Sequence, residues 1–220
     1  MTIPGVEHLD VWQLVALAAA LGWASGIRLY AVLFIVGGAG FLHWIDLPHG
    51  LSLLAHPLVL LASGCMCAVE FFADKIPGVD SAWDVVHTFI RIPAGAALAG
   101  GVFGDDPGAM MLAGAILGGS LAAGSHFAKS GARAVINASP EPFSNWAASL
   151  GEDVAVGAML WLAVALPLLA LAIIAVLFAG SLWLIHKAWR SLNRTLAGVG
   201  AVIGAREAKR NSTTGNATDV

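Results

Sequence analysis

The chain has 220 residues, of which 58% are hydrophobic and 11% are charged, against roughly 25% charged in ordinary soluble domains. This composition, with a mean hydropathy of +0.81, excludes an ordinary soluble protein and predicts an integral membrane protein with one all-α, polytopic domain. The formal net charge is −3, and no basic patch of the kind that binds nucleic acid is present. The apolar runs are continuous rather than alternating, which disfavours a β-barrel.

About five membrane-spanning helices are predicted, at about 20 residues per span. The first apolar segment, from about residue 11 to 42, is too long for one perpendicular span. Arg28 interrupts it, which predicts a tilted, kinked or broken helix. The last segment contains Pro167 and could span once or twice; the sequence favours one span. The remaining predicted spans are residues 58–73, 81–102, 108–136 and 154–185.

The ends of the chain differ in charge, and this predicts its domains and orientation. Residues 1–10 form an N-terminal segment, 11–195 the transmembrane domain, and 196–220 a polar, disordered tail. By the positive-inside rule the C-terminus is cytoplasmic, and the N-terminus lies outside if the number of spans is odd. No basic region precedes the first apolar segment, so no cleaved signal peptide is expected. Six of the eleven basic residues lie near the C-terminus: Lys187, Arg190, Arg194, Arg206, Lys209 and Arg210.

A charged stretch between the second and third apolar segments is the most informative part of the sequence. One charged side chain at the centre of a membrane helix costs about 2.5–3.5 kcal/mol. We therefore expect the cluster to face a cavity, a partner charge or a ligand. Several of its residues recur every three or four positions and lie on one helix face. The cluster consists of Glu70, Asp74, Lys75, Asp80, Asp84, His87 and Arg91.

Further polar residues in the other apolar segments could meet this cluster. The fourth segment carries a stripe of His126, Lys129, Arg133 and Asn137, and Arg28 stands alone in the first. Asn145, Glu152 and Asp153 lie near the start of the last segment. If these side chains meet the charged stretch, the cations and carboxylates would neutralise most of one another's charge and form a polar core. The Ser-Gly-x-Arg sequence ending at Arg28 recurs at Arg133, a weak echo of the inverted repeats found in many transporters.

Two interpretations of the polar core stay open. It could be a structural network of ion pairs that fixes how broken helices pack. It could also be a polar cavity for an ion, a proton or an anionic head group, since buried ion pairs are often no more stabilising than apolar packing. The carboxylates could hold a divalent cation, but the nearby cations favour ion pairing, and a metal site stays unknown. No catalytic residue and no cofactor motif is identified.

Several motifs resemble a known family. They are Glu70-x-x-Ala-Asp-Lys-Ile-Pro-Gly-Val-Asp80, Thr88-Phe-x-Arg91-x-Pro-Ala-Gly95, Asn137-x-Ser-Pro-Glu-Pro-Phe-Ser-Asn145 and Glu152-Asp153. Over roughly residues 10–195 the chain resembles a family of small bacterial multi-pass membrane proteins catalogued as a domain of unknown function, number 4126. The resemblance implies a membrane-embedded domain in the bacterial inner membrane. It supports the choice of polar motifs but implies no reaction.

The leading hypothesis is a transporter- or channel-like membrane protein for a small ion or an anionic solute or lipid head group. Loops 75–81 and 137–146 would gate its cavity. The alternatives are a structural or assembly protein and a metal-dependent enzyme acting on phospholipids. The expected partner is the lipid bilayer, and a homo-oligomer stays open. The candidate cavity residues are Arg28, Glu70, Asp74, Lys75, Asp80, Asp84, His87, Arg91, His126, Lys129, Arg133, Asn137, Asn145, Glu152 and Asp153.

Overall fold

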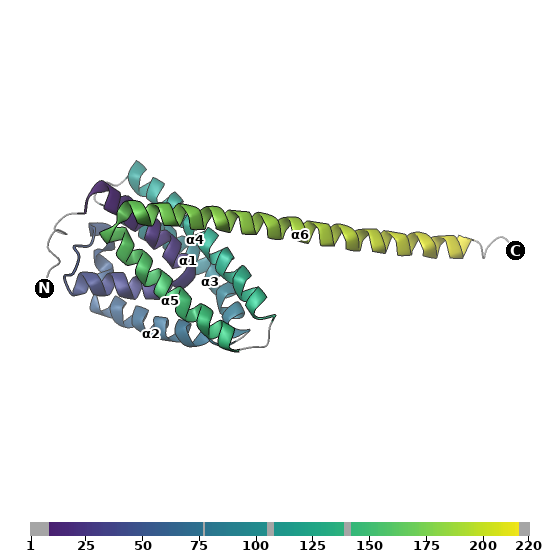
Figure 1. Cartoon of the computed structure of the whole chain (residues 1–220), viewed down its shortest axis with the longest axis horizontal. Helices are drawn as coiled ribbons and strands as arrows, with labels where there is room; N and C mark the ends of the chain where they lie inside the picture. Colours follow the sequence, from purple (N-terminus) through teal and green to yellow (C-terminus); the bar gives the residue numbers. More distant parts are fainter. Residues whose placement is uncertain (1–8, 77, 105–107, 139–141, 216–220) are drawn as a thin grey trace. The chain divides into compact units, whose positions relative to one another are not determined.

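The structure, a computed structural model, describes residues 9–76, 78–104, 108–138 and 142–215 (Figure 1). Within these ranges the chain is entirely helical apart from its connections, which confirms the all-α fold class. The elements are α1 (Val11–Phe41), the 3-10 helix η1 (His49–Ala55), α2 (Pro57–Ala73), α3 (Val79–Gly101), α4 (Ala109–Ile136), α5 (Pro142–Ala165) and α6 (Pro167–Gly215).

The helices are those of a multi-pass membrane protein. Four are long and apolar enough to cross a membrane: α1, α4, residues Phe143–Ala165 of α5 and residues Pro167–Arg190 of α6. The pair formed by η1 and α2, bent by 70°, would be a fifth. The count agrees with the predicted number of spans. The helix α3 carries a stripe of charges and is not among these helices, although the sequence predicted a span there.

The last apolar segment forms two helices, so the preference for one span was wrong. The helix α5 ends at Ala165 and α6 begins at Pro167. Proline favours a break here because it lacks an N–H and fits the first turn of a new helix. Each helix is long and apolar enough to span the membrane by itself.

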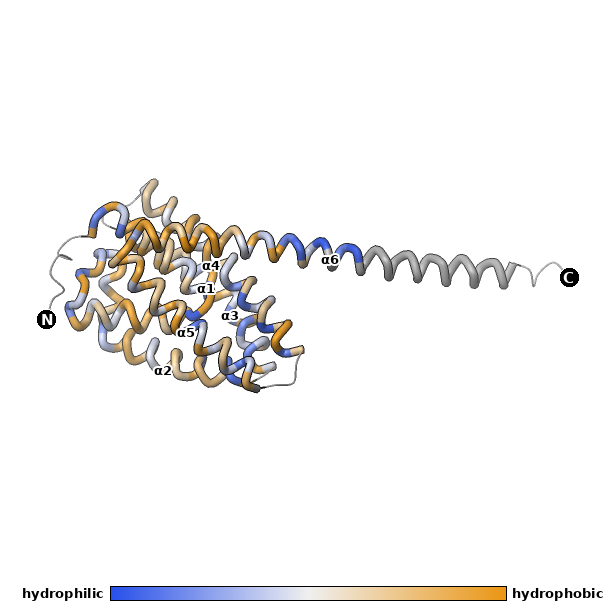
Figure 2. The backbone as a smooth tube through the Cα atoms, viewed as in Figure 1, coloured by the Kyte–Doolittle hydropathy of each residue, from blue (hydrophilic) through white to orange (hydrophobic). Residues whose placement is uncertain are grey.

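Helix α1 is the buried centre of the bundle, and α2, α3, α4 and α5 all pack against it. Glycines allow the backbones to approach closely, as small residues do between membrane helices. A Cβ on Gly22 would lie 2.5 Å from the Gly118 Cα, and one on Gly118 would lie 2.6 Å from the Gly95 carbonyl oxygen. Figure 2 shows that most of the bundle is apolar, with hydrophilic stretches confined to parts of its helices.

The predicted break in α1 is confirmed at Arg28, whose φ of −143° and ψ of 75° are not helical. The first half of α1 runs into the bundle from one end, and the second half returns toward that same end (Figure 1). Gln13, in the first half, donates to the Val164 carbonyl near the end of α5 at 2.9 Å. Gly37, in the second half, packs against Leu54 of η1. The helix therefore turns back at Arg28, inside the bundle.

The chain divides into two compact units, residues Met1–Ser181 and Leu182–Val220. The second unit continues α6 as helix to Gly215, and alanine, arginine, glutamate and lysine in this segment have high helix propensity. The disordered tail predicted from residue 196 stays a prediction. The predicted domain boundary at residue 195 stays a prediction.

Candidate functional site

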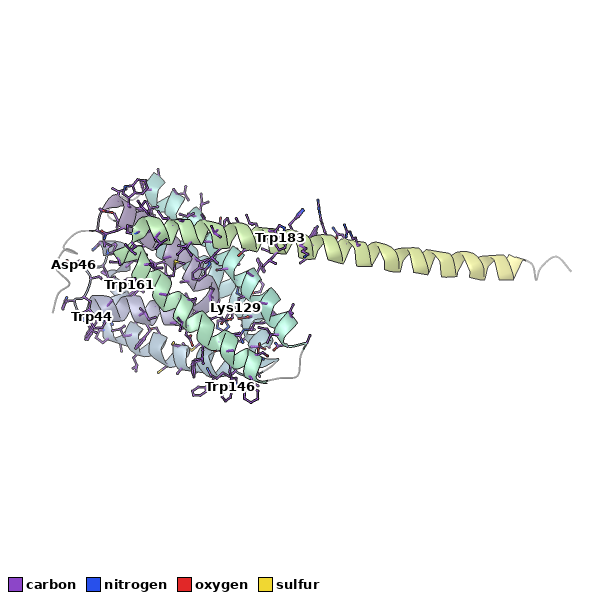
Figure 3. All side chains as sticks on the ribbon, in the orientation of Figure 1. Trp44, Asp46, Lys129, Trp146, Trp161 and Trp183 are labelled. Carbon is purple, nitrogen blue, oxygen red and sulfur yellow. The ribbon has the colours of Figure 1, made fainter. Side chains whose placement is uncertain are left out.

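The polar stripes predicted on α3 and α4 are buried and face each other. Asp80, Asp84, His87 and Arg91 of α3 are buried, as are His126, Lys129 and Arg133 of α4. The spacing of three and four residues sets each group on one helix face, and the glycine contacts between α3 and α4 bring the two faces together. Lys129 lies inside the bundle, whereas Trp44 and Trp146 lie at its edges (Figure 3).

Arg91 joins two carboxylates through one guanidinium group. Its Nη2 lies 2.5 Å from the Glu70 Oε1, and its Nη1 lies 2.6 Å from the Asp84 Oδ1. Its Nη1 also lies 3.4 Å from Nδ1 of His126, and the Nε2 of that ring lies 2.7 Å from the Thr88 hydroxyl. Arg91 and Glu70 are completely buried. Arg91 therefore links α2 to α3 and α4 in the interior of the bundle.

Asp74, the residue that follows α2, is the anionic centre of the network. Its Oδ2 lies 3.2 Å from Arg28, 3.0 Å from Lys129 and 3.8 Å from Arg133. Burial by itself would raise the pKa of Asp74, but Lys129 and Arg28 outweigh it and hold the pKa below its ordinary value. Asp74 thus fixes the end of α2 to both α1 and α4.

Helix α5 supplies the remaining charges. Arg28 Nε lies 3.1 Å from Asp153, and Arg133 Nη2 lies 3.0 Å from Glu152. The Nη2 of Arg28 also donates to the Ser149 hydroxyl at 2.7 Å. The two arginines of the weak sequence echo thus bind neighbouring carboxylates on one turn of α5.

Side chains of α4 donate hydrogen bonds to the backbone carbonyls that precede the break in α1. Lys129 Nζ donates to the Ile27 carbonyl at 3.1 Å, and the Ser125 hydroxyl donates to the Trp23 carbonyl at 2.7 Å. Such partners are required because irregular backbone at membrane depth is tolerated only when it is buried in protein or lines a cavity. A cation is also favoured at the carbonyl end of a helix by the helix dipole.

Three helix ends are joined by amide hydrogen bonds. The Asn137 Nδ2 donates to both carboxylate oxygens of Asp80 at 2.9 Å and to the Ser81 hydroxyl at 3.0 Å. The Asn145 Nδ2 in turn donates to Asn137 Oδ1 at 2.8 Å. The beginning of α3, the end of α4 and the beginning of α5 therefore meet at one end of the bundle. Four residues of the predicted gating loops, at positions 77 and 139–141, lie outside the described residues.

His87 and Lys75 lie at the edge of this network. His87 stacks on Trp83 with ring centroids 4.1 Å apart, and its Nε2 lies 3.2 Å from the Tyr30 hydroxyl. Lys75 Nζ lies over the Phe71 ring and donates to the Ser149 hydroxyl at 3.4 Å. Both make hydrogen bonds with neutral groups rather than ion pairs.

The structure therefore brings all the sequence-predicted residues into one connected region. Asp84 binds Arg91 and Lys129, two of the four candidate cations. Ser149, which is completely buried and binds Arg28, was missed. Its position four residues after Asn145 and three before Glu152 places it on the same face of α5, and this spacing could have identified it.

The network holds more negative than positive charge. Six carboxylates, those of Glu70, Asp74, Asp80, Asp84, Glu152 and Asp153, share four cations, those of Arg28, Arg91, Lys129 and Arg133. Among the described residues, buried oxygens of Glu70, Asp74 and Asp84 have no hydrogen-bond partner. In the same part of the chain no group of three histidine, cysteine or carboxylate side chains could hold a metal ion.

The sequence matches the family described as "Domain of unknown function (DUF4126)" over residues 15–187. This range includes every residue of the network described above. No curated protein and no solved structure matches the chain. The match extends over more than half of the chain, which therefore belongs to the DUF4126 family.

Proposed function

We propose that the chain is a transporter- or channel-like membrane protein that moves a small cation, with the proton as the simplest case. The observation that carries this proposal is the surplus of carboxylates over cations in the network, in which four carboxylates are buried and Glu152 and Asp153 are partly exposed. Even with Lys75 counted, one negative charge stays uncompensated by protein groups. An uncompensated charge is expensive in an apolar bundle. Glu70 is completely buried, and within the described residues its Oε2 has no hydrogen-bond partner, so a cation or a proton bound there would stabilise the folded protein.

The depth of the network supports the same conclusion. From Asp80 to Arg91, α3 rises about 16 Å, which is about half of the ~30 Å hydrocarbon core. The network thus extends from one end of the bundle to the level where α1 breaks at Arg28. Broken helices that meet a polar site near the bilayer midplane are typical of transporters. The candidate residues would form the ion path. Its mouth would be the end of the bundle where Asn137 binds Asp80 and Asn145.

An anionic substrate is less well supported than a cation. Each of the four cations of the network already binds at least one carboxylate, at 3.2 Å or less. An anion would enter a site that already has surplus negative charge, and its Coulomb repulsion in a low-dielectric interior would be large. The leading substrate class is therefore a small cation.

We also propose an orientation. The orientation assumes that α1 enters and returns from one side and that α3 crosses despite its charges, although it is not among the apolar helices found above. The pair η1 with α2, and then α3 to α6, would make five crossings, which puts the N-terminus outside and the C-terminus in the cytoplasm. The mouth at Asn137 then opens to the cytoplasm, on the side of Lys75 and the basic C-terminal end. The connections at the opposite end, residues 42–56 and 102–108, contain no lysine or arginine, as the positive-inside rule requires. We place the protein in the bacterial inner membrane.

A flux assay tests the proposal. Purified protein is reconstituted in liposomes that contain a pH-sensitive dye, and gradients of protons, sodium and potassium are imposed in turn. We expect at least one cation to enter faster than in protein-free liposomes. Glu70→Gln should remove this flux, whereas Asp46→Asn, the same change at an exposed carboxylate, should keep it. Equal flux with and without protein for every cation would contradict the proposal.

A structural or assembly role is the second candidate, and it is favoured because each of the four network cations is paired with a carboxylate. A membrane protein could use these pairs only to fix how α1 packs against α2 to α5. In that case exchanging the charges of Glu70 and Arg91 should restore both stability and cellular phenotype. A metal-dependent enzyme has less support, since no suitable cluster of ligands lies in the described part of the chain.

A further inference from the structure

An open groove lies between α2 and the second half of α1. Its volume is about 420 Å³, within the range of small-molecule sites. Its walls are apolar, with Phe34 and Ile35 on α1 and Gly64, Cys67 and Phe71 on α2. Phe34 and Ile35 are also exposed at the surface of the bundle, so the groove is open to the bilayer.

The shape of the groove suits an acyl chain. Along α2 it extends from Gly64 to Phe71, two helical turns or about 10 Å. A Cβ on Gly64 would lie 3.0 Å from the Phe34 ring, so Phe34 packs directly against α2 at this end of the groove and keeps the groove narrow. The surrounding bilayer is as apolar as the groove, so polarity does not favour binding of a hydrocarbon chain there. Close packing in a long, narrow groove does favour it, through dispersion contacts.

A cation without an ion-pair partner stands at one end of the groove. Lys75 lies one turn beyond Phe71, and its Nζ lies 2.8 Å from the centroid of the Phe71 ring that lines the groove. It donates to the Phe71 carbonyl at 3.2 Å and to the Ser149 hydroxyl at 3.4 Å. Within the described residues no carboxylate lies within ion-pair distance of Lys75, in contrast to Arg28, Lys129 and the other network cations.

The environment of Lys75 favours an anion beside it. Burial lowers the pKa of Lys75 below its ordinary value, and the nearby Arg28 adds to this effect. Asp153 and Asp74 act in the opposite direction but do not reverse the shift. Asp153, the carboxylate that lines the groove, is bound to Arg28 at 3.1 Å. An anionic group at Lys75 would therefore meet a cation that the protein itself leaves unpaired.

We infer that this groove binds one acyl chain of an anionic phospholipid, with the lipid phosphate paired to Lys75. The Lys75 ammonium group lies just beyond the end of α2, where a head group at the membrane interface can reach it. The chain would follow α2 from Phe71 toward Gly64. This inference is independent of cation transport, because neither the chain nor the phosphate occupies the ion-pair network.

The two cysteines of the chain supply a direct test, since both are free and Cys67 lines the groove. In a Cys65→Ser background, Cys67 is alkylated with a maleimide in mixed micelles. The micelles contain phosphatidylglycerol or phosphatidylcholine with the same acyl chains. We expect phosphatidylglycerol to slow alkylation by a factor of about 1 + [L]/Kd, and phosphatidylcholine to have a much smaller effect.

Substitutions at Lys75 separate head-group recognition from simple filling of the groove. Lys75→Gln should remove the advantage of phosphatidylglycerol, Lys75→Arg should keep it, and the control Lys187→Gln, at an exposed lysine of α6, should leave it unchanged. Thermal unfolding of each variant without lipid checks that it is folded. Equal protection by both lipids, or full protection of Lys75→Gln by phosphatidylglycerol, would overturn the inference.

Discussion

Arg91 and Glu70 form an ion pair with a separation of 2.5 Å, and neither side chain has any exposed surface. Because Arg91 also binds Asp84 at 2.6 Å, the two carboxylates depend on one guanidinium group. This unequal sharing distinguishes the network from a simple set of paired charges. It also makes the members of the network unequal in their effects on stability.

Loss of Arg91 should therefore cost more than loss of Glu70. Arg91→Gln leaves two buried carboxylates without their cation, and removal of one partner of a buried pair costs about 3–5 kcal/mol. Glu70→Gln leaves Arg91 bound to Asp84 and removes one surplus charge, so we expect a cost of about 1 kcal/mol, that of a hydrogen bond. Unfolding of both variants in detergent, followed by tryptophan fluorescence, measures the difference. Equal destabilisation would argue against shared charge compensation.

The close approach of α1 to α4 should make Gly22 intolerant of a side chain. A Cβ on Gly22 would lie 2.5 Å from the Gly118 Cα, so the helices must separate. We expect Gly22→Ala to destabilise the protein by about 1–3 kcal/mol. Gly157→Ala is the control, since apart from its own helix backbone no atom of the described residues lies within 4 Å of its added Cβ, and alanine favours a helix by up to about 1 kcal/mol. Similar thermal stability of the two variants would contradict this packing.

The Asn137 amide should hold the mouth of the network closed. Asn137→Ala removes the hydrogen bonds to Asp80 and Ser81, and we expect amide hydrogen exchange in the first turn of α3 to accelerate. Asn137→Asp should have a larger effect because it places a second carboxylate against Asp80. Exchange in the centre of α1 is the internal reference. If the first turn of α3 exchanges at the wild-type rate in both variants, the amide does not secure these ends.

Stability should depend on pH through Asp74. Its pKa is lowered in the folded protein, so its contribution is complete above the unfolded-state pKa of about 3.9. The contribution is lost as the pH falls through the lower folded-state pKa. We expect the wild-type free energy of unfolding to decrease below about pH 4, and Asp74→Asn to show a weaker decrease. Identical pH profiles for the two proteins would show that Asp74 is not held ionised by Lys129 and Arg28.

The sequence predicts the polar faces of single helices well, because charges at spacings of three and four residues align wherever the helix packs. It also predicts the break at Arg28, since a charge after Ser25-Gly26 cannot stay in an uninterrupted apolar span. The ion-pair partner of each charged side chain was harder to predict from the sequence. Of the four candidate cations, Asp84 binds Arg91 and Lys129, because the rotation of α3 against α4 decides which side chains meet. That rotation depends on tertiary contacts such as Gly95 with Gly118.

The reversal of α1 at Arg28 could not be predicted from the sequence either. Composition gives the length of an apolar segment but not the direction of the chain after a break. The sequence shows where the last segment is interrupted, at Pro167. It does not show whether the segment spans once or twice, since a proline can either kink a span or begin a new helix. Similarly, the groove beside Lys75 depends on two helices that meet only in the folded protein.

Cation flux in proteoliposomes tests the central claim most directly when wild type is compared with the Glu70→Arg, Arg91→Glu double variant. The exchange keeps both charges and should restore much of the stability lost in Arg91→Gln. The account predicts that wild type carries a cation and that the folded double variant does not, because the carboxylate no longer stands at the position of Glu70. A folded double variant with wild-type flux, or a wild type without flux for protons, sodium and potassium, would contradict it.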